Sequence, residues 1–427
     1  MHFIMYCVFF LLATYFQALY FYKTYVIANV ILVLYVMFLV YGQYKDGQYI
    51  RVDYLTFYLL GFMLLYILSI FYGVNEEGAV QEAIRVSGYL PAFLVGIYLT
   101  ERQRRYLEDA IIVSAVFVCI MGLAAFLGII DMQGAIYEGR IQSTIGYANT
   151  TGLYFLLAIV TCVNTLKQVD NANKGRHRFF VGAFYILACG LILAFSRGVF
   201  LLAMFTACFA LFSKWWIQEK TVKVQCIFIV GLAIMVSLIL IIVEIIWVGA
   251  LAILLGVILC LNANKICMRC GWKILWIIPI MIVVAFIQGA HISLRIGWFV
   301  PTEWQARIGY YKGAMNMISD YPIWGAGARS FELLWQTYIV DYTKYVHNYY
   351  LQILCDVGLV GFGFFLVFIM GIIRSLIQTV HKNEYTFIMI AIILLHALVD
   401  VGFHFQLIAI IFFIYCGEVR KQLIIKN

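Results

Sequence analysis

The chain has 427 residues, of which 65% are hydrophobic and 12% are charged. A soluble globular protein usually has about a quarter charged residues, so this composition excludes an ordinary soluble domain. The formal net charge of +8 does not indicate nucleic-acid binding, because the basic residues are spread over short loops between apolar segments.

Apolar segments recur along the whole chain. A helix that crosses a bilayer needs roughly 20 mostly apolar residues, and we count about fourteen segments of this kind. We therefore predict an all-α, polytopic transmembrane protein with about fourteen spans, or about twelve if residues 179–212 and 224–261 each form one long helix. The predicted spans are 3–22, 25–42, 53–72, 84–99, 107–130, 144–166, 178–195, 198–213, 223–243, 245–261, 272–290, 346–373, 385–400 and 403–418.

The first segment has neither a basic n-region nor a small-residue cleavage site, so we expect a retained span and not a signal peptide. Basic residues set the orientation of the spans. With a cytoplasmic N-terminus, every cytoplasmic loop carries at least two Lys or Arg residues, which is the positive-inside pattern and predicts that both termini are cytoplasmic. The remaining nine of the 29 Lys and Arg residues then lie on the outer side: Lys23, Arg85, Arg140, Arg197, Arg295, Arg307, Lys312, Arg329 and Lys344.

One outer segment, residues 291–346, is much longer than the other loops. Thr302–Gln305 has the pattern of a capping box, and Trp304, Ile308, Tyr311 and Met315 follow with helical spacing. We predict a helix there, a turn at 324–327, a second short helix at 330–342, and so a small extracytoplasmic helical cap. The predicted division of the chain is N-terminal helices 1–130, central helices 131–290, the outer helical loop 291–346 and C-terminal helices 347–427.

Four outer arginines are candidate ligands for a phosphate group, because Arg forms bidentate bonds to phosphate and stays charged. These are Arg140, Arg197, Arg307 and Arg329. Each one taken singly is as consistent with an arginine that reaches to lipid phosphates.

His347 follows the outer loop directly, and an imidazole can accept a proton from a sugar hydroxyl. Asn348 is its neighbour and a candidate glycan ligand. Asp400 is a candidate to bind substrate or to orient the base or an arginine. A metal site at His396, Asp400 and His404 is disfavoured because the turn between the last two spans breaks the helical register, so we predict none.

Four stretches occur in a characteristic order: Arg140–Asn149, Phe195–Gly198, Arg307–Gly327 and His347–Gly361. In this order they resemble the O-antigen ligase and O-antigen polymerase family of bacterial membrane glycosyltransferases. The resemblance covers roughly residues 135 to 405, and Ala148 stands where the family often has proline.

The resemblance implies a C-type glycosyltransferase fold, an undecaprenyl-pyrophosphate-linked glycan donor and an active site on the outer face of the bacterial inner membrane. It implies that Arg197 and Arg307 bind the donor pyrophosphate and that His347 activates the acceptor hydroxyl. The transfer would be inverting, with no metal and no other cofactor.

Of the family activities, we favour polymerisation of lipid-linked repeat units over ligation of the glycan to lipid A core or to protein. A lipid-linked oligosaccharide flippase is the alternative from another class, and it predicts inverted repeats and charges lining a cavity at bilayer depth. The expected partners are the lipid-linked donor, a glycan acceptor, membrane lipid and a chain-length regulator or flippase, with no nucleic acid.

Overall fold

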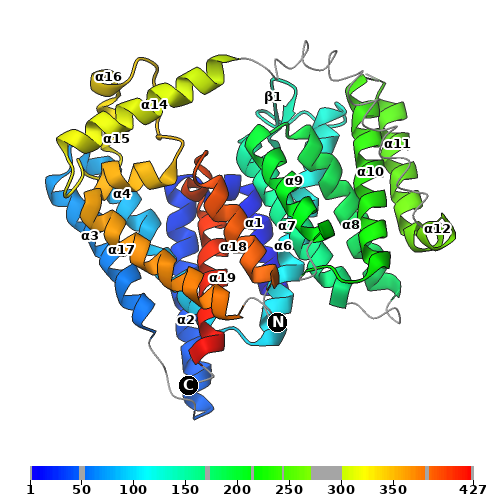
Figure 1. Cartoon of the computed structure of the whole chain (residues 1–427), viewed down its shortest axis with the longest axis horizontal. Coiled ribbons are helices and arrows are strands. Elements are labelled where there is room, and N and C mark those ends of the chain that lie inside the picture. Colours follow the sequence, from blue (N-terminus) through cyan, green and yellow to red (C-terminus); the bar gives the residue numbers. More distant parts are fainter. Residues whose placement is uncertain are drawn as a thin grey trace. The chain divides into compact units, whose positions relative to one another are not determined.

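The computed structural model describes residues 2–47, 53–168, 174–212, 216–242, 245–270, 301–379 and 384–424. Helices make up most of this part of the chain, and one short hairpin pairs β1 (Ile136–Tyr137) with β2 (Arg140–Ile141). The predicted all-α fold class is therefore confirmed (Figure 1). Every predicted span contains a helix except 272–290, which lies outside the described residues.

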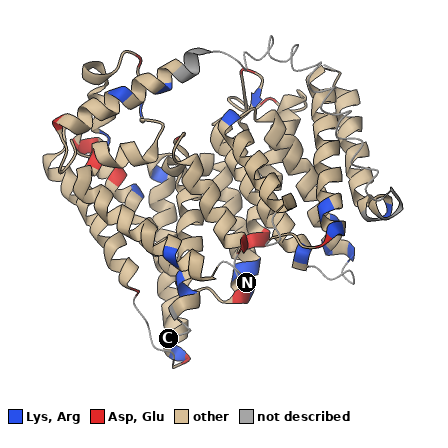
Figure 2. Ribbon diagram, in the orientation of Figure 1, with Lys and Arg blue, Asp and Glu red and all other residues tan. Residues whose placement is uncertain are grey.

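Seven of the described helices are long and apolar enough to cross a membrane, and four shorter ones are also apolar. Large hydrophobic side chains are exposed along several of them, including Phe57, Phe71 and Met37. Such surfaces are unfavourable in water and are typical of contact with lipid. Most charged residues lie near the ends of helices (Figure 2), which is where a spanning helix leaves the hydrocarbon. The chain is a multi-pass membrane protein.

The described residues divide into two compact units, and the first combines Met1–Gln17 with Arg105–Val300. Its helices are α1 (His2–Tyr15), most of α6 (Glu101–Phe126), α7 (Ala148–Gln168), α8 (Lys174–Leu193), α9 (Arg197–Phe212), α10 (Lys220–Ile242), α11 (Ile246–Leu261) and α12 (Ala263–Cys270). Helix α7 packs against α8 and forms the centre of this unit, since 94% of its most apolar stretch is buried. Residues 179–212 and 224–261 each contain two helices, as the fourteen-span prediction requires.

The second unit combines Ala18–Arg104 with Pro301–Asn427. Its helices are α2 (Tyr22–Lys45), α3 (Tyr54–Tyr72), α4 (Glu76–Ser87), α5 (Tyr89–Tyr98), α14 (Pro301–Asp320), α15 (Ser330–Leu333), α16 (Trp335–Tyr338), α17 (Tyr349–Thr379), α18 (Glu384–His396), the 3₁₀ turn η5 (Gly402–His404) and α19 (Gln406–Ile424). Helices α5 and α19 pack closely where Gly96 faces Gly417, since a Cβ atom on either would collide with backbone of the other helix. Small residues allow this close approach of two buried helices.

Three differences from the predicted boundaries have a local explanation or concern the predicted outer loop. Helix α1 ends at Tyr15 and not near residue 22, because Gln17, Ala18 and Leu19 have positive φ angles that no α-helix contains. The predicted span 84–99 falls within two helices that meet at Gly88, because Pro91 has no N–H group and belongs in the first turn of a new helix.

The third difference concerns the outer loop. Helix α14 begins at Pro301, so Thr302 lies inside the helix and is not its N-cap. The second predicted helix, at 330–342, is two separate short helices, α15 and α16. The predicted turn at 324–327 is present, with positive φ angles at Gly325 and Gly327.

Helix α17 is broken at Gly358, whose φ of 61° and ψ of −164° are not helical. The backbone of residues 322–327 lies against this break and satisfies its polar groups. The N–H groups of Leu359 and Val360 donate to the carbonyl oxygens of Pro322 (2.9 Å) and Ile323 (3.2 Å), and Ala326 N–H donates to the carbonyl of Cys355 (2.9 Å). The segment 322–327 is thus hydrogen-bonded to the helix that follows His347 in the chain.

Candidate active site

Helix α14 carries Arg307, whose guanidinium contacts the turn between α18 and η5. Its Nη2 donates to Oδ2 of Asp400 at 3.0 Å, and its Nη1 donates to the carbonyl oxygen of Val399. Asp400 is buried and Arg307 is partly exposed. The carboxylate therefore holds one N–H edge of the guanidinium in place, as expected for a charge-assisted hydrogen bond.

His347 lies beside this ion pair, with its Nδ1 at 4.0 Å from Oδ1 of Asp400. Its φ of 58° is in the left-handed region, which is uncommon for a residue other than glycine. The Tyr310 ring is stacked at 5.8 Å from the imidazole, and the Tyr311 hydroxyl donates to the His347 carbonyl oxygen at 3.2 Å. The Nδ1 atom is buried and has no hydrogen-bond partner among the described residues. A strained backbone that holds a partly satisfied imidazole is characteristic of a functional position.

The charge state of this group follows from its surroundings. Burial lowers the pKa of His347 below its usual value, Asp400 acts in the opposite direction, and Arg307 adds to the lowering. Burial raises the pKa of Asp400, but His396, Arg307 and His347 together hold it below its usual value. At neutral pH the imidazole is therefore uncharged and the carboxylate is ionised. An uncharged imidazole is able to accept a proton.

Asn348 begins the next helix. Its Oδ1 accepts from the backbone N–H groups of Tyr350 (3.0 Å) and Leu351 (3.1 Å), which makes it the N-cap of α17. The Tyr349 N–H donates to the carbonyl oxygen of Ala397 at 2.8 Å. These bonds hold the start of α17, and with it His347, against the turn that carries Asp400. Substrate binding by Asn348 stays a prediction.

Arg329 belongs to a different group of contacts. Its Nε donates to Oε2 of Glu332 at 2.9 Å, and its Nη1 donates to Oε1 of Gln81 at 2.5 Å. Its backbone N–H donates to Oδ1 of Asp356 at 3.1 Å. The guanidinium is thus bonded to α4 and α15, and its predicted role in phosphate binding stays a prediction.

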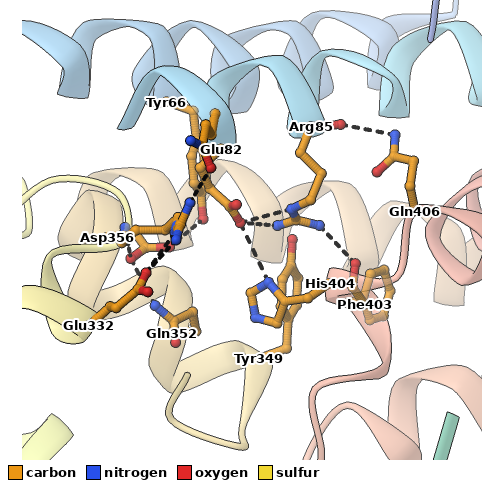
Figure 3. Close-up of polar contacts among 12 residues, drawn as sticks. Tyr66, Glu82, Arg85, Glu332, Tyr349, Gln352, Asp356, Phe403, His404 and Gln406 are labelled. Atoms are coloured by element: carbon orange, nitrogen blue, oxygen red, sulfur yellow. Dashed lines mark hydrogen bonds and ion pairs between the residues drawn. The ribbon is translucent and has the colours of Figure 1, made fainter. Parts of the chain in front are cut away.

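A second polar cluster, which the sequence did not lead us to expect, is centred on Glu82 of α4 (Figure 3). Nε of Arg85 donates to Oε1 of Glu82 at 2.9 Å, and Nδ1 of His404 lies 3.5 Å from the same oxygen. Nη1 of Arg85 also donates to the Phe403 carbonyl oxygen at 2.8 Å. We call Glu82, Arg85 and His404 the inner cluster. The signal in the sequence is an acid and a base three residues apart on one helical face.

The inner cluster is connected to the helix that follows His347. Nη1 of Arg85 donates to the Tyr89 hydroxyl at 2.6 Å, and this hydroxyl lies 3.0 Å from that of Tyr349. Burial lowers the pKa of His404 to about 4, although Glu82 acts in the opposite direction. His404 is therefore uncharged at neutral pH, and Glu82 forms its ion pair with Arg85.

The other two predicted arginines, Arg140 and Arg197, lie in the first unit. Arg140 Nη2 donates to Oδ1 of Asn149 at 2.7 Å, and its Nε donates to the Ala194 carbonyl oxygen at 3.2 Å. Arg197 is the first residue of α9, three residues after Ala194. This unit thus brings the strand β2 that carries Arg140 to the turn before Arg197. Both side chains are partly exposed.

Of the predicted site residues, the second unit brings together Arg307, His347 and Asp400, with Asn348 next to them in the chain. No group of three or more His, Cys, Asp or Glu residues in the described ranges has an arrangement that would hold a metal ion. His404 pairs with Glu82 of the inner cluster, whereas Asp400 pairs with Arg307 and His347.

These features define a helical, multi-pass membrane protein in which a histidine, a carboxylate and an arginine gather where α14 meets the start of α17 and the turn after α18. Residues 243–366 match the family model described as O-antigen ligase. This match supports the resemblance of the sequence to the O-antigen ligase and O-antigen polymerase family. The matched range includes Arg307, Arg329, His347 and Asn348. No curated protein matches the chain.

Proposed function

We propose that the chain polymerises undecaprenyl-pyrophosphate-linked oligosaccharide repeat units into a cell-surface polysaccharide. The observation that carries this proposal is the His347 imidazole beside the Arg307–Asp400 ion pair. Two of these three residues fall in the range that matches the family model.

His347 is the general base of the proposed reaction. A proton on Nδ1 faces Asp400, so the lone pair on Nε2 takes the proton from the acceptor hydroxyl. The acceptor oxygen then attacks the anomeric carbon of the donor, and the bond from this carbon to the pyrophosphate oxygen breaks. Undecaprenyl pyrophosphate leaves with the electron pair, and attack from the opposite face inverts the anomeric configuration.

Arg307 stabilises the negative charge that develops on the leaving pyrophosphate. Asp400 and Val399 orient its guanidinium before substrate binds, and a preorganised charge lowers a barrier more than one that must first reorient. Arg140, Arg197, Arg329 and Asn348 are further proposed ligands of the pyrophosphate or the glycan. This chemistry needs no metal ion.

The proposed location is the bacterial inner membrane, with both termini cytoplasmic and the active site on the outer face of a C-type glycosyltransferase fold. The segments 1–130, 131–290, 291–346 and 347–427 then correspond to N-terminal spans, central spans, the outer helical loop and C-terminal spans. A chain-length regulator or a flippase is a proposed partner.

Reconstitution tests this function. The purified chain in lipid vesicles, given a lipid-linked repeat unit and EDTA, should produce a ladder of longer lipid-linked glycans. Replacement of Arg307 by Gln should lower kcat/KM for the donor by about 10²–10³, the loss expected for one electrostatic contact in the transition state. Movement of the lipid-linked glycan across the bilayer with no new glycosidic bond would instead identify a transporter.

Ligation is the second candidate, because the matching family model is described as O-antigen ligase. The same vesicles supplemented with lipid A core or with protein acceptors distinguish the two activities. A single transfer to the added acceptor, with no ladder in its absence, would establish a ligase.

A further inference from the structure

Lys344 is a partly buried cation that lies three residues before His347. Its Nζ is 5.1 Å from the centre of the Tyr20 ring and 5.4 Å from that of the Tyr345 ring. Among the described residues, no hydrogen bond or ion pair to this ammonium group is present beside these two ring contacts. Burying an ammonium group without an anion costs free energy, and two aromatic faces offset only part of this cost.

The carboxylates near Lys344 are already paired with other cations. Glu332 accepts from Arg329, and Glu82 accepts from Arg85 in the inner cluster. Burial has the largest effect on Lys344 and lowers its pKa, and the charges of Arg329 and Arg85 lower the pKa further. The carboxylates of Glu332 and Glu82 raise it. Each of these two ion pairs has no net charge. The positive charge of Lys344 therefore has no negative counterpart among these neighbouring side chains.

The surroundings of this charge fit a sugar. The Tyr345 ring is stacked on His404 with a centroid distance of 3.7 Å, which fixes one wall beside the ammonium. On the same loop, the exposed Tyr342 donates to Oε1 of Glu332 at 3.3 Å and packs edge-on against Trp335. Aromatic faces beside hydrogen-bonding groups are the usual means of holding a pyranose ring, and a carboxylate on that ring would complete the charge balance.

We propose that Lys344 binds a carboxylate carried by the glycan, so that the substrate of this chain contains an acidic sugar such as a hexuronic acid. This inference rests on the proposed function, since it assigns the class of glycan that reaches His347. The ammonium donates hydrogen bonds to the carboxylate, and Tyr20 and Tyr345 flank the ammonium.

The test is a binding measurement with the full chain in lipid nanodiscs. The probes are the lipid-linked glycan isolated from the cells that make this chain and the same glycan after chemical reduction of its carboxyl groups to primary alcohols. The unaltered chain should bind the native probe at least about tenfold more tightly than the reduced probe, the size of one charge-assisted hydrogen bond. Lys344→Met should abolish this difference, and Lys344→Arg should retain most of it.

Lys312→Met is the matched control, because Lys312 is an exposed lysine on α14. It should keep the full preference for the native probe. Equal affinity of the unaltered chain for both probes would overturn the inference, as would a Lys344→Met variant that keeps the preference. A loss of affinity for both probes in Lys344→Met would also overturn it and would assign the lysine to the shared lipid phosphates.

Failure of the proposed function has a different signature. In that case the nanodiscs bind the glycan with the predicted preference, but no glycosidic bond forms in the vesicle assay.

Discussion

Two ion-pair groups of the second unit contain the same kinds of side chain in different settings. In the inner cluster, Arg85 and Glu82 are each only 2% exposed, and His404 is equally buried. In the outer group, Arg307 and His347 are 22% and 23% exposed, and only Asp400 is buried. Each group thus combines an arginine, an acid and a histidine.

The comparison assigns a structural role to the inner cluster and a chemical role to the group that contains His347. The guanidinium of Arg85 is bonded to a carboxylate, a carbonyl oxygen and a tyrosine hydroxyl, all within the fold. The imidazole of His347 is 4.0 Å from its carboxylate and partly open to solvent. Complete pairing of the buried Arg85 and Glu82 charges favours a rigid framework, whereas the partly exposed Arg307 and His347 are accessible to a substrate.

Replacement of His347 should have the largest effect on activity. His347→Asn keeps a side chain that tolerates the left-handed backbone but removes the base, so kcat should fall by about 10²–10⁴. Glycosyl transfer in vesicles measures the rate, and thermal unfolding should show a stability close to that of the unaltered chain. His177→Asn, in the first turn of α8, is the control and should keep full activity. A fully active His347→Asn variant would remove the histidine from the mechanism.

Replacement of Glu82 should affect folding. Glu82→Gln leaves the buried Arg85 without an anionic partner, and loss of one member of a buried pair costs about 3–5 kcal/mol. Chemical unfolding in detergent measures this loss, with Glu76→Gln as control because Glu76 is exposed on the same helix. Asp400→Asn should cost less, since Arg307 keeps contact with water. Equal stability losses in Glu82→Gln and Asp400→Asn would contradict the distinction between the two groups.

The smallest expected effects are on the pH dependence of transfer. Protonated His347 is inactive as a base, so kcat/KM should fall at acidic pH with an apparent pKa below the usual histidine value of 6.5. Asp400→Asn removes a charge that raises the pKa of His347, so this acidic limb should move to lower pH. Arg307→Gln removes a charge that lowers it, so the limb should move to higher pH. If the apparent pKa of kcat/KM moved in the same direction in both variants, a group other than His347 would control the loss of activity at acidic pH.

The sequence predicts the helices well because each span is a run of apolar residues, and this requirement is local. It also predicts the members of the outer group, since His347 and Asp400 are polar residues at the ends of apolar segments and Arg307 is a basic residue of the long loop between two of them. The contact between Glu82 and His404 joins positions more than 300 residues apart, and no local pattern indicates it. The position of Arg197 relative to His347 likewise depends on long-range packing, and their joint action stays a proposal.

The break in α17 limits how the outer loop can be exchanged between relatives. Residues 322–327 supply the carbonyl and N–H groups that pair with the backbone around Gly358. A chimera that replaces the loop alone would leave those groups unpaired inside the membrane protein, where water cannot substitute for them. Exchange of this loop between related proteins would therefore require the loop and the first turns of α17 to be transferred together.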